Sequence, residues 1–213
     1  MFVASLAICA WWYLDILARP AGAAVWPALA YDAALFGIFA SHHSVFARDA
    51  VKNRIARAVP PPLIRSVFVW IASALLILVC VLWQPIGGDL YNVTGARAWL
   101  HAAVQLAGVW LIAGSARTID ALELAGIRHG SAGGPLQITG PYRWVRHPLY
   151  LGWMIVLFGV AHMTAARLTF AAISSLYLIV AIPWEERSLA REFPGQYSAY
   201  QQRVRWRVVP YVY

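Results

Sequence analysis

The stretch GPYRWVRHPLYLGW, residues 140–153, decides the fold of this chain. It begins as a basic, aromatic turn and becomes an apolar run, which predicts a crossing from water into a membrane within a few residues. A second polar cluster, WEER at residues 184–187, stands at the far end of the next apolar run. If the two runs form a helical hairpin, both polar clusters return to one face of the membrane. That arrangement is typical of a functional site.

The composition excludes an ordinary soluble domain. The chain has 213 residues, of which 61% are hydrophobic and only 12% charged, and this balance is typical of polytopic membrane proteins. A net charge of +8 would suggest nucleic acid in a soluble protein, but here the arginines fall between apolar runs and indicate topology. We therefore expect membrane lipids as partners and no nucleic acid. Cys9 and Cys80 lie in apolar runs without a Cys-x-x-Cys motif, so neither a disulfide framework nor a metal site is expected.

Six apolar segments have the length of about 20 residues that a spanning helix needs. They are residues 2–18, 27–46, 63–84, 98–118, 147–164 and 166–184. The predicted fold class is an all-α polytopic membrane bundle of about six transmembrane helices with a C-terminal interfacial helical segment. We expect one domain over 1–213, with a four-helix part at 1–118. In the fourth helix, Gly108 and Gly114 permit close helix approach.

The basic residues predict the orientation of these helices. Fourteen of the 17 lysines and arginines lie on the side that holds both termini and the two long connections. The opposite side receives only Arg19, Arg97 and Arg167. Because positive residues favour the cytoplasmic side, we expect both termini to be cytoplasmic and the chain to be integral to the cell (inner) membrane.

The second predicted helix carries polar residues. Asp32 lies inside it, and His42, His43 and Ser44 lie near its cytoplasmic end. An ionisable group within the membrane is costly unless it faces the bundle interior, so Asp32 is either functional or close to the outer interface. The two histidines either line the cytoplasmic mouth of a cavity or cap the helix.

The fifth predicted helix begins at His147-Pro148, and proline is preorganised for the first helical position. Arg143, Arg146, His147 and Tyr150 fall within eight residues, and Tyr150 follows His147 by three, so both project to similar sides of a helix. This density of donors favours a site over an ordinary helix start with an interfacial tyrosine.

After Pro183 the chain is expected to leave the membrane through Glu185-Glu186. Apolar residues then recur at spacings of three and four and predict a surface-lying or cavity-covering helix, which Pro194-Gly195 breaks in two. They are Leu189, Phe193, Tyr197, Tyr200 and Val204. Residues 126–140, rich in glycine, lack the strand-then-helix context of a dinucleotide site and are read as a surface loop.

A cytoplasmic cavity with carboxylates, arginines, a histidine and aromatics suits a zwitterionic ligand. S-adenosylmethionine is one such ligand, since its amino group pairs with a carboxylate, its carboxylate with arginine, and its sulfonium with aromatic faces. These properties alone do not single out this cofactor.

Two linked motifs narrow the choice. GPYR at 140–143 with RHPLYLG at 146–152, followed by EExxL at 185–189 and FxxxYxxY at 193–200, resembles the isoprenylcysteine carboxyl methyltransferase family of integral-membrane enzymes. The resemblance implies that S-adenosyl-L-methionine binds in 119–213, between the last two helices and the C-terminal segment. The implied cofactor contacts are Arg146, His147, Tyr150, Glu185, Glu186 and Tyr197.

The N-terminal half is similar to the bacterial methanethiol S-methyltransferase branch, and more distantly to NnrU proteins. The similarity lies in HSV at 43–45 with Arg48, and in WQPI at 83–86. The chain departs from that branch by a shorter connection before Gly140 and by His42, where glutamine is expected. These departures bear on the substrate more than on the reaction.

A thiol acceptor must lose a proton, because its pKa near 8.5 keeps it mostly protonated at neutral pH. His43 and His147 are therefore the candidate catalytic bases, and His42, His43 and Arg143 the candidate substrate-binding residues. The predicted function is methyl transfer to a small or lipophilic thiol at the cytoplasmic membrane interface. Carboxyl methylation of a prenylcysteine and N-methylation of a lipid amine stay open, as does a non-catalytic permease or NnrU-like accessory protein.

Overall fold

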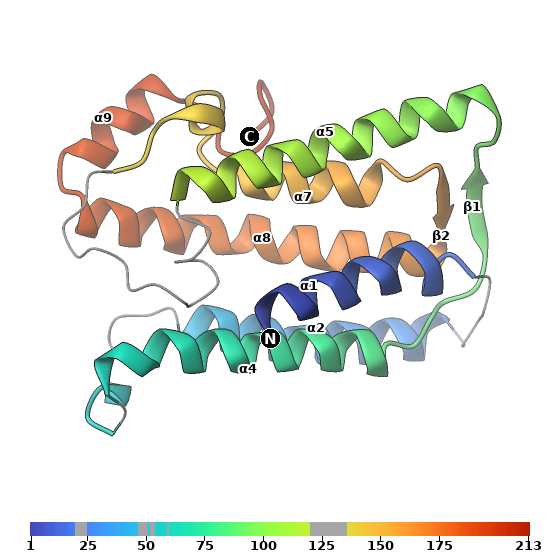
Figure 1. The fold of residues 1–213 in the computed structure, drawn as a ribbon, viewed down its shortest axis with the longest axis horizontal. Helices are drawn as coiled ribbons and strands as arrows, with labels where there is room; N and C mark the ends of the chain where they lie inside the picture. The colour runs from blue at the N-terminus through green and yellow to red at the C-terminus, as the bar shows by residue number, and fades with distance from the viewer. Residues whose placement is uncertain (20–24, 47–50, 52–53, 59, 120–135) are drawn as a thin grey trace. The chain divides into compact units, whose positions relative to one another are not determined.

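The computed structural model describes residues 1–19, 25–46, 51, 54–58, 60–119 and 136–213 (Figure 1). Contacts divide these residues into two compact units. Unit 1 contains the described residues of 1–92 and 162–174, and unit 2 those of 93–119, 136–161 and 175–213.

Unit 1 is built on three apolar helices. Helix α4 (Pro61–Leu82) packs against both α1 (Phe2–Trp11) and α2 (Val25–Phe46) (Figure 1). A π-helical turn, Trp12–Ile16, continues α1. A short strand β1 (Asp89–Asn92) pairs antiparallel with β2 (His162–Thr164), from which the first turns of α8 (Ala165–Glu192) begin.

The core of unit 1 is aromatic. Phe170 on α8 is completely buried, and its ring meets the edges or faces of Trp12 and Trp83 at centroid distances of 5.1 and 5.5 Å. Trp12 and Trp83 lie 5.7 Å from each other in a T-shaped arrangement. Such edge-to-face packing contributes about 0.5–1.5 kcal/mol per pair beyond the buried area.

Asp32 is completely buried in unit 1. Its Oδ1 accepts a hydrogen bond from the backbone N–H of Gln84 at 2.9 Å, just beyond the end of α4. The carboxylate therefore pairs with a backbone donor that lies beyond the helix, and this contact fixes the exit of the chain from α4. A functional role for Asp32 stays a prediction.

Arg167 is a second buried charge in unit 1, only 5% exposed. Its Nε donates to the carbonyl of Tyr13 at 3.0 Å, its Nη2 to that of Leu14 at 2.6 Å, and its Nη1 to that of His162. The guanidinium therefore satisfies carbonyls of the π-helical turn and of β2, which binds the end of the first helix to the start of α8.

Unit 2 contains α5 (Ala96–Ile119), the 3-10 turn η2 (Gly140–Arg143), α7 (Pro148–Phe158), the rest of α8 and α9 (Gln196–Arg203). Helices α5 and α7 lie side by side (Figure 1). A Cβ on Gly108 would lie 2.9 Å from the carbonyl of Gly152, and a Cβ on Gly152 would lie 2.9 Å from the carbonyl of Gly108. This glycine pair permits the close approach that the sequence predicted for Gly108.

Each of the six predicted helices has a counterpart, but two boundaries were wrong. The fifth ends at Phe158 rather than near 164, because residues 162–164 form β2 instead. At Gly159 a Cβ would meet the carbonyl of Ile155 at 2.5 Å, so this end of the helix requires glycine. The sixth continues through Pro183 to Glu192, so Glu185 and Glu186 lie on α8 and not beyond it.

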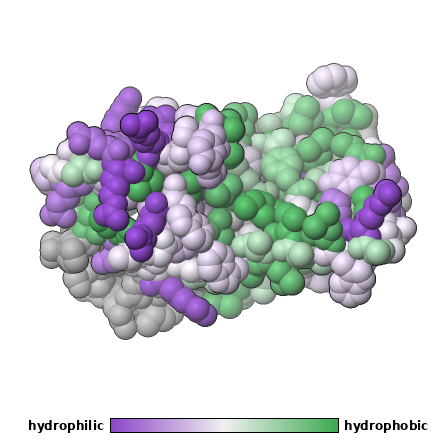
Figure 2. Space-filling model, turned by 90° about the horizontal axis from the view of Figure 1, so that it is seen from above, coloured by the Kyte–Doolittle hydropathy of each residue, from purple (hydrophilic) through white to green (hydrophobic). Residues whose placement is uncertain are grey.

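Three helices of the described part of the chain are long and apolar enough to cross a membrane. They are Leu63–Leu82, Ala96–Ile119 and Ala165–Glu192, and Phe2–Ile16 and Pro148–Phe158 are shorter apolar helices. On the face that Figure 2 shows, hydrophobic side chains cover the middle, and hydrophilic ones lie toward the two ends, most of them at the end where α9 lies. The protein is therefore a helical membrane protein; six spans stay a prediction. Most of the predicted surface loop at 126–140 lies outside the described residues.

Candidate active site

The site is built around the start of α7. His147 is the N-cap of this helix and Pro148 its first residue, as the sequence predicted. The backbone N–H groups of Arg146 and His147 donate to the carbonyls of Trp206 and Arg207 at 2.9 and 2.7 Å. The chain after α9 therefore runs along the start of α7 and fixes the backbone from which these side chains project.

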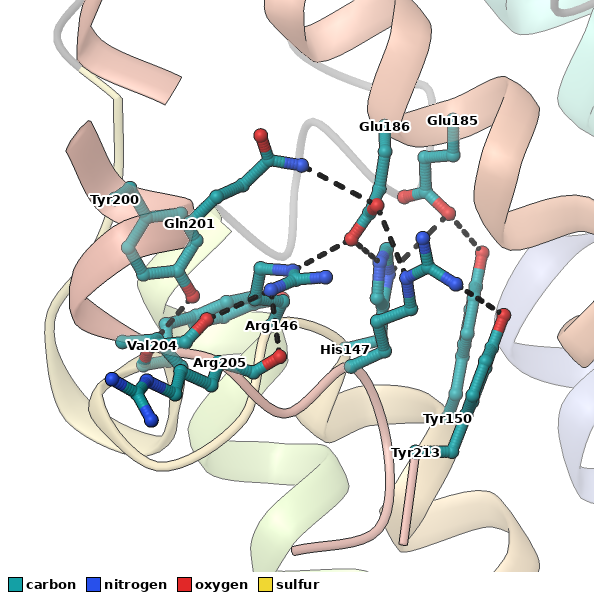
Figure 3. Close-up of polar contacts among 12 residues, drawn as sticks. Arg146, His147, Tyr150, Glu185, Glu186, Tyr200, Gln201, Val204, Arg205 and Tyr213 are labelled. Atoms are coloured by element: carbon teal, nitrogen blue, oxygen red, sulfur yellow. Dashed lines mark hydrogen bonds and ion pairs between the residues drawn. The ribbon is translucent and has the colours of Figure 1, made fainter. Parts of the chain in front are cut away.

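Glu186 on α8 is the centre of the polar cluster, and its side chain is only 7% exposed (Figure 3). Its Oε1 accepts a hydrogen bond from Arg146 Nε at 2.7 Å and lies 3.4 Å from His147 Nε2. Its Oε2 lies 3.3 Å from Arg207 Nε and 3.4 Å from Gln201 Nε2. Both oxygens are engaged, so Glu186 joins α8 to the start of α7, to α9 and to the C-terminal segment.

Glu185, one residue earlier, has a different environment. Its side chain is 42% exposed, and its Oε2 accepts a hydrogen bond from the Tyr150 hydroxyl at 2.6 Å (Figure 3). The same oxygen lies 3.6 Å from His147 Nδ1. No described residue hydrogen-bonds to its Oε1. Glu185 therefore retains an exposed carboxylate oxygen that can bind a cation.

His147 lies between the two carboxylates, and its ring stacks on that of Tyr150 at a centroid distance of 5.3 Å and an angle of 12°. Each ring nitrogen faces one glutamate, Nδ1 toward Glu185 and Nε2 toward Glu186. The imidazole therefore links the two glutamates of α8 to the start of α7.

Arg146 is engaged in the same way as Glu186. Its side chain is 8% exposed, and besides the bond to Glu186 its Nη1 donates to the carbonyls of Val204 and Arg205 at 2.9 and 2.8 Å. The charge is thus paired and hydrogen-bonded, which a buried guanidinium requires.

The predicted apolar stripe forms one cluster beside these charges. Tyr200 donates from its hydroxyl to the Tyr142 carbonyl at 2.7 Å. The hydroxyl of Tyr197, which is 1% exposed, has no hydrogen-bond partner among the residues that the structure describes. Burial first, and the Glu186 charge second, raises the pKa of Tyr197, so its phenol stays protonated. The cluster comprises Tyr142, Tyr197, Tyr200 and Val204, with Leu189 and Phe193 packed against it.

The structure brings together six of the predicted site residues in unit 2: Arg146, His147, Tyr150, Glu185, Glu186 and Tyr197. Arg143, on η2, is exposed and forms no hydrogen bond or ion pair with them. His42 and His43 belong to unit 1. There, the His42 ring is buried between those of Phe46 and Phe68, at centroid distances of 4.6 and 5.3 Å.

Sequence reasoning missed Arg207 and Gln201 as members of the site. The sequence marked Arg207 only as a topology determinant, although Arg205 and Arg207 alternate with Trp206 and Val208 as they would in an extended segment. No group of three or more metal-ligating side chains is present in the described part of the chain.

The apolar helices are those of a membrane protein, and the polar cluster at the start of α7 is its candidate site. Residues 126–191 match the isoprenylcysteine carboxyl methyltransferase (ICMT) family. The chain is 37% identical to methanethiol S-methyltransferase 2 of Bradyrhizobium diazoefficiens, over 80% of this chain and 69% of that protein.

Further relatives have the same description. Methanethiol S-methyltransferase of Crocosphaera subtropica is 36% identical over 83% of this chain and 73% of its own. That of Mycobacterium tuberculosis is 34% identical over 88% and 79%. No solved structure matches the chain. The chain belongs to the ICMT family and is an enzyme, a methyltransferase.

Proposed function

We propose that the protein transfers a methyl group from S-adenosylmethionine to a small thiol, at the cytoplasmic side of an inner membrane that it crosses about six times with both termini cytoplasmic. The observation that carries the proposal is the pair Glu185 and Glu186, one exposed and one fully engaged, on either side of His147. The relatives are named for methanethiol, which supports a small thiol as the acceptor.

The residues fit this cofactor. Glu185 has an exposed carboxylate oxygen for an ammonium group, and the stacked rings of His147 and Tyr150 offer a flat aromatic wall. The buried hydroxyl of Tyr197 makes no hydrogen bond of ordinary geometry within the described residues, and the Glu186 carboxylate acts on it. S-adenosylmethionine, when bound, supplies an electrophilic methyl group on a positively charged sulfur.

Glu186 and Arg146 have a different task in this proposal. Because their charged atoms are already paired and hydrogen-bonded, they position His147 and the C-terminal segment rather than bind the donor. A positioned site keeps the reacting groups aligned, which an in-line displacement requires.

The acceptor thiol must lose its proton during transfer. His147, whose Nδ1 lies 3.6 Å from Glu185 Oε2, is the proposed general base that accepts this proton. His43 is the second candidate base and is proposed to line the acceptor side, with His42. A His43→Ala enzyme with full turnover and an unchanged pH profile of kcat/KM contradicts this role.

The test is methyl transfer from labelled S-adenosylmethionine by the purified protein, across small thiols, prenylcysteine analogues and lipid amines. Glu185→Gln removes the proposed ammonium ligand, and Glu192→Gln is the matched control, an exposed carboxylate on the same helix. We expect thiol turnover that Glu185→Gln lowers and Glu192→Gln does not. Turnover on the prenylcysteine or the amine alone contradicts the assignment of a thiol acceptor. Absence of S-adenosylmethionine binding contradicts the assignment of the cofactor.

A further inference from the structure

A cavity of about 750 Å³ opens between the C-terminal end of α5 and η2, apart from the contacts of Glu185 and Glu186. Glycine permits the close approach that forms it: a Cβ on Gly114 would lie 3.3 Å from Pro141 Cγ. Gly140 has a φ of +57°, and a Cβ there would lie 3.2 Å from Thr118 Oγ1. The walls include Trp110, Gly114, Arg117, Pro141, Arg143 and Trp144.

Two positive charges line this cavity. Arg117, in the last turn of α5, and Arg143, at the end of η2, are both exposed. Within the described ranges neither forms an ion pair or a hydrogen bond, whereas Arg146, three residues further on, is fully engaged. No carboxylate is among the described lining residues. The cavity therefore suits an anion and offers nothing to the ammonium of a zwitterion.

The cavity also lies where an apolar helix surface meets these charges. Trp110 and Trp144 lie 6.0 Å apart at its wall and are 59% and 58% exposed. On the preceding turn of α5, a candidate membrane span, Leu106 and Val109 are 68% and 52% exposed. Exposed tryptophans beside exposed apolar side chains are typical of the level of lipid headgroups.

We propose that this cavity binds the phosphate of an anionic phospholipid, with Arg117 and Arg143 as its ligands and an acyl chain along the exposed apolar surface of α5. A soluble phosphate ester shares the headgroup chemistry but has no use for the apolar surface at Leu106 and Val109. A basic pocket at the cytoplasmic end of a spanning helix is a recognised setting for anionic lipids. The proposal assigns Arg143 to lipid rather than to the methyl acceptor.

The test counts lipids bound to the detergent-purified protein by native mass spectrometry, with dioleoylphosphatidylglycerol and dioleoylphosphatidylcholine titrated separately. We expect the anionic lipid, dioleoylphosphatidylglycerol, to bind preferentially. Each of Arg117→Gln and Arg143→Gln should lower its affinity about fivefold, from the usual contribution of one basic residue to anionic lipid binding. Arg97→Gln is the matched control, because Arg97 is exposed at the opposite end of α5.

A second variant keeps the charges and fills the space. Ala113 is exposed and lines the cavity. The variant Ala113→Phe should therefore also weaken the binding of dioleoylphosphatidylglycerol and leave the melting temperature unchanged. Equal binding of both lipids, or equal loss in Arg97→Gln, overturns the proposal. Competition by soluble glycerol phosphate at equal concentration identifies a phosphate ester site and overturns the lipid. If Arg117→Gln weakens S-adenosylmethionine as much as lipid, the cavity belongs to the methyl-transfer site.

Discussion

Replacing Glu186 by alanine should destabilise the protein far more than replacing its neighbour Glu185. The change leaves the Arg146 guanidinium, 8% exposed, without its carboxylate. Breaking a buried ion pair in this way costs about 3–5 kcal/mol. Two carbonyl acceptors remain on Arg146 Nη1, which places the expected cost near the lower end of that range. For a chain of this length, about 3 kcal/mol lowers the melting temperature by roughly 6–12 °C.

The matched change, Glu185→Gln, removes a charge that is 42% exposed and weakens one hydrogen bond, from Tyr150. Its cost in stability should not exceed about 1 kcal/mol. Its affinity for S-adenosylmethionine should fall at least about tenfold, because a charge-assisted hydrogen bond contributes about 1.5–3 kcal/mol. Thermal melting followed by tryptophan fluorescence, and a donor titration, measure both effects. The reasoning is refuted if the Glu186→Ala protein melts like the wild type. It is also refuted if the Glu185→Gln protein is less stable than the Glu186→Ala protein.

Three further outcomes are expected. Gly108→Leu should destabilise the protein by about 1–3 kcal/mol or more, since a Cβ there meets Val156 Cγ2 at 2.8 Å, whereas Gly37→Leu, with open space at its Cβ, should not; melting temperatures decide. Arg167→Ala removes the donor from one buried and two partly buried carbonyls and should cost at least about 1 kcal/mol by the same measurement. Tyr200→Phe should lower the stability by about 1 kcal/mol, because it loses the hydrogen bond to the Tyr142 carbonyl. Tyr197→Phe should keep its stability but bind S-adenosylmethionine more weakly in a titration.

Hydropathy predicted the positions of the helices more accurately than it predicted their ends. Each apolar run became a helix because only a helix satisfies its backbone within a membrane. The helix predicted after His147 was too long, since Val160 and Ala161 continue the apolar run although the chain pairs with β1 at residues 162–164. That pairing depends on a strand about 70 residues earlier, which no local pattern contains.

Residue types predicted the members of the cluster but not their roles. His147 and Tyr150 were predicted from their spacing, and Glu185 and Glu186 from their place at the end of the next apolar run and from the family resemblance. The structure brings the four side chains together. The sequence could not show that Arg146 donates hydrogen bonds to the carbonyls of Val204 and Arg205. Every residue carries a backbone carbonyl, so the residue type does not indicate which carbonyl is the acceptor.

Helix geometry explains why two adjacent carboxylates can have separate tasks. Successive residues on a helix point about 100° apart, so a doublet at the end of α8 places one side chain inward and the other toward the exposed side. The inward one, Glu186, is covered by α9 and the C-terminal segment through Gln201 and Arg207. That covering leaves Glu185 as the carboxylate with an accessible oxygen. Removing Glu186 therefore tests the positioning of the site, whereas removing Glu185 tests the binding of S-adenosylmethionine.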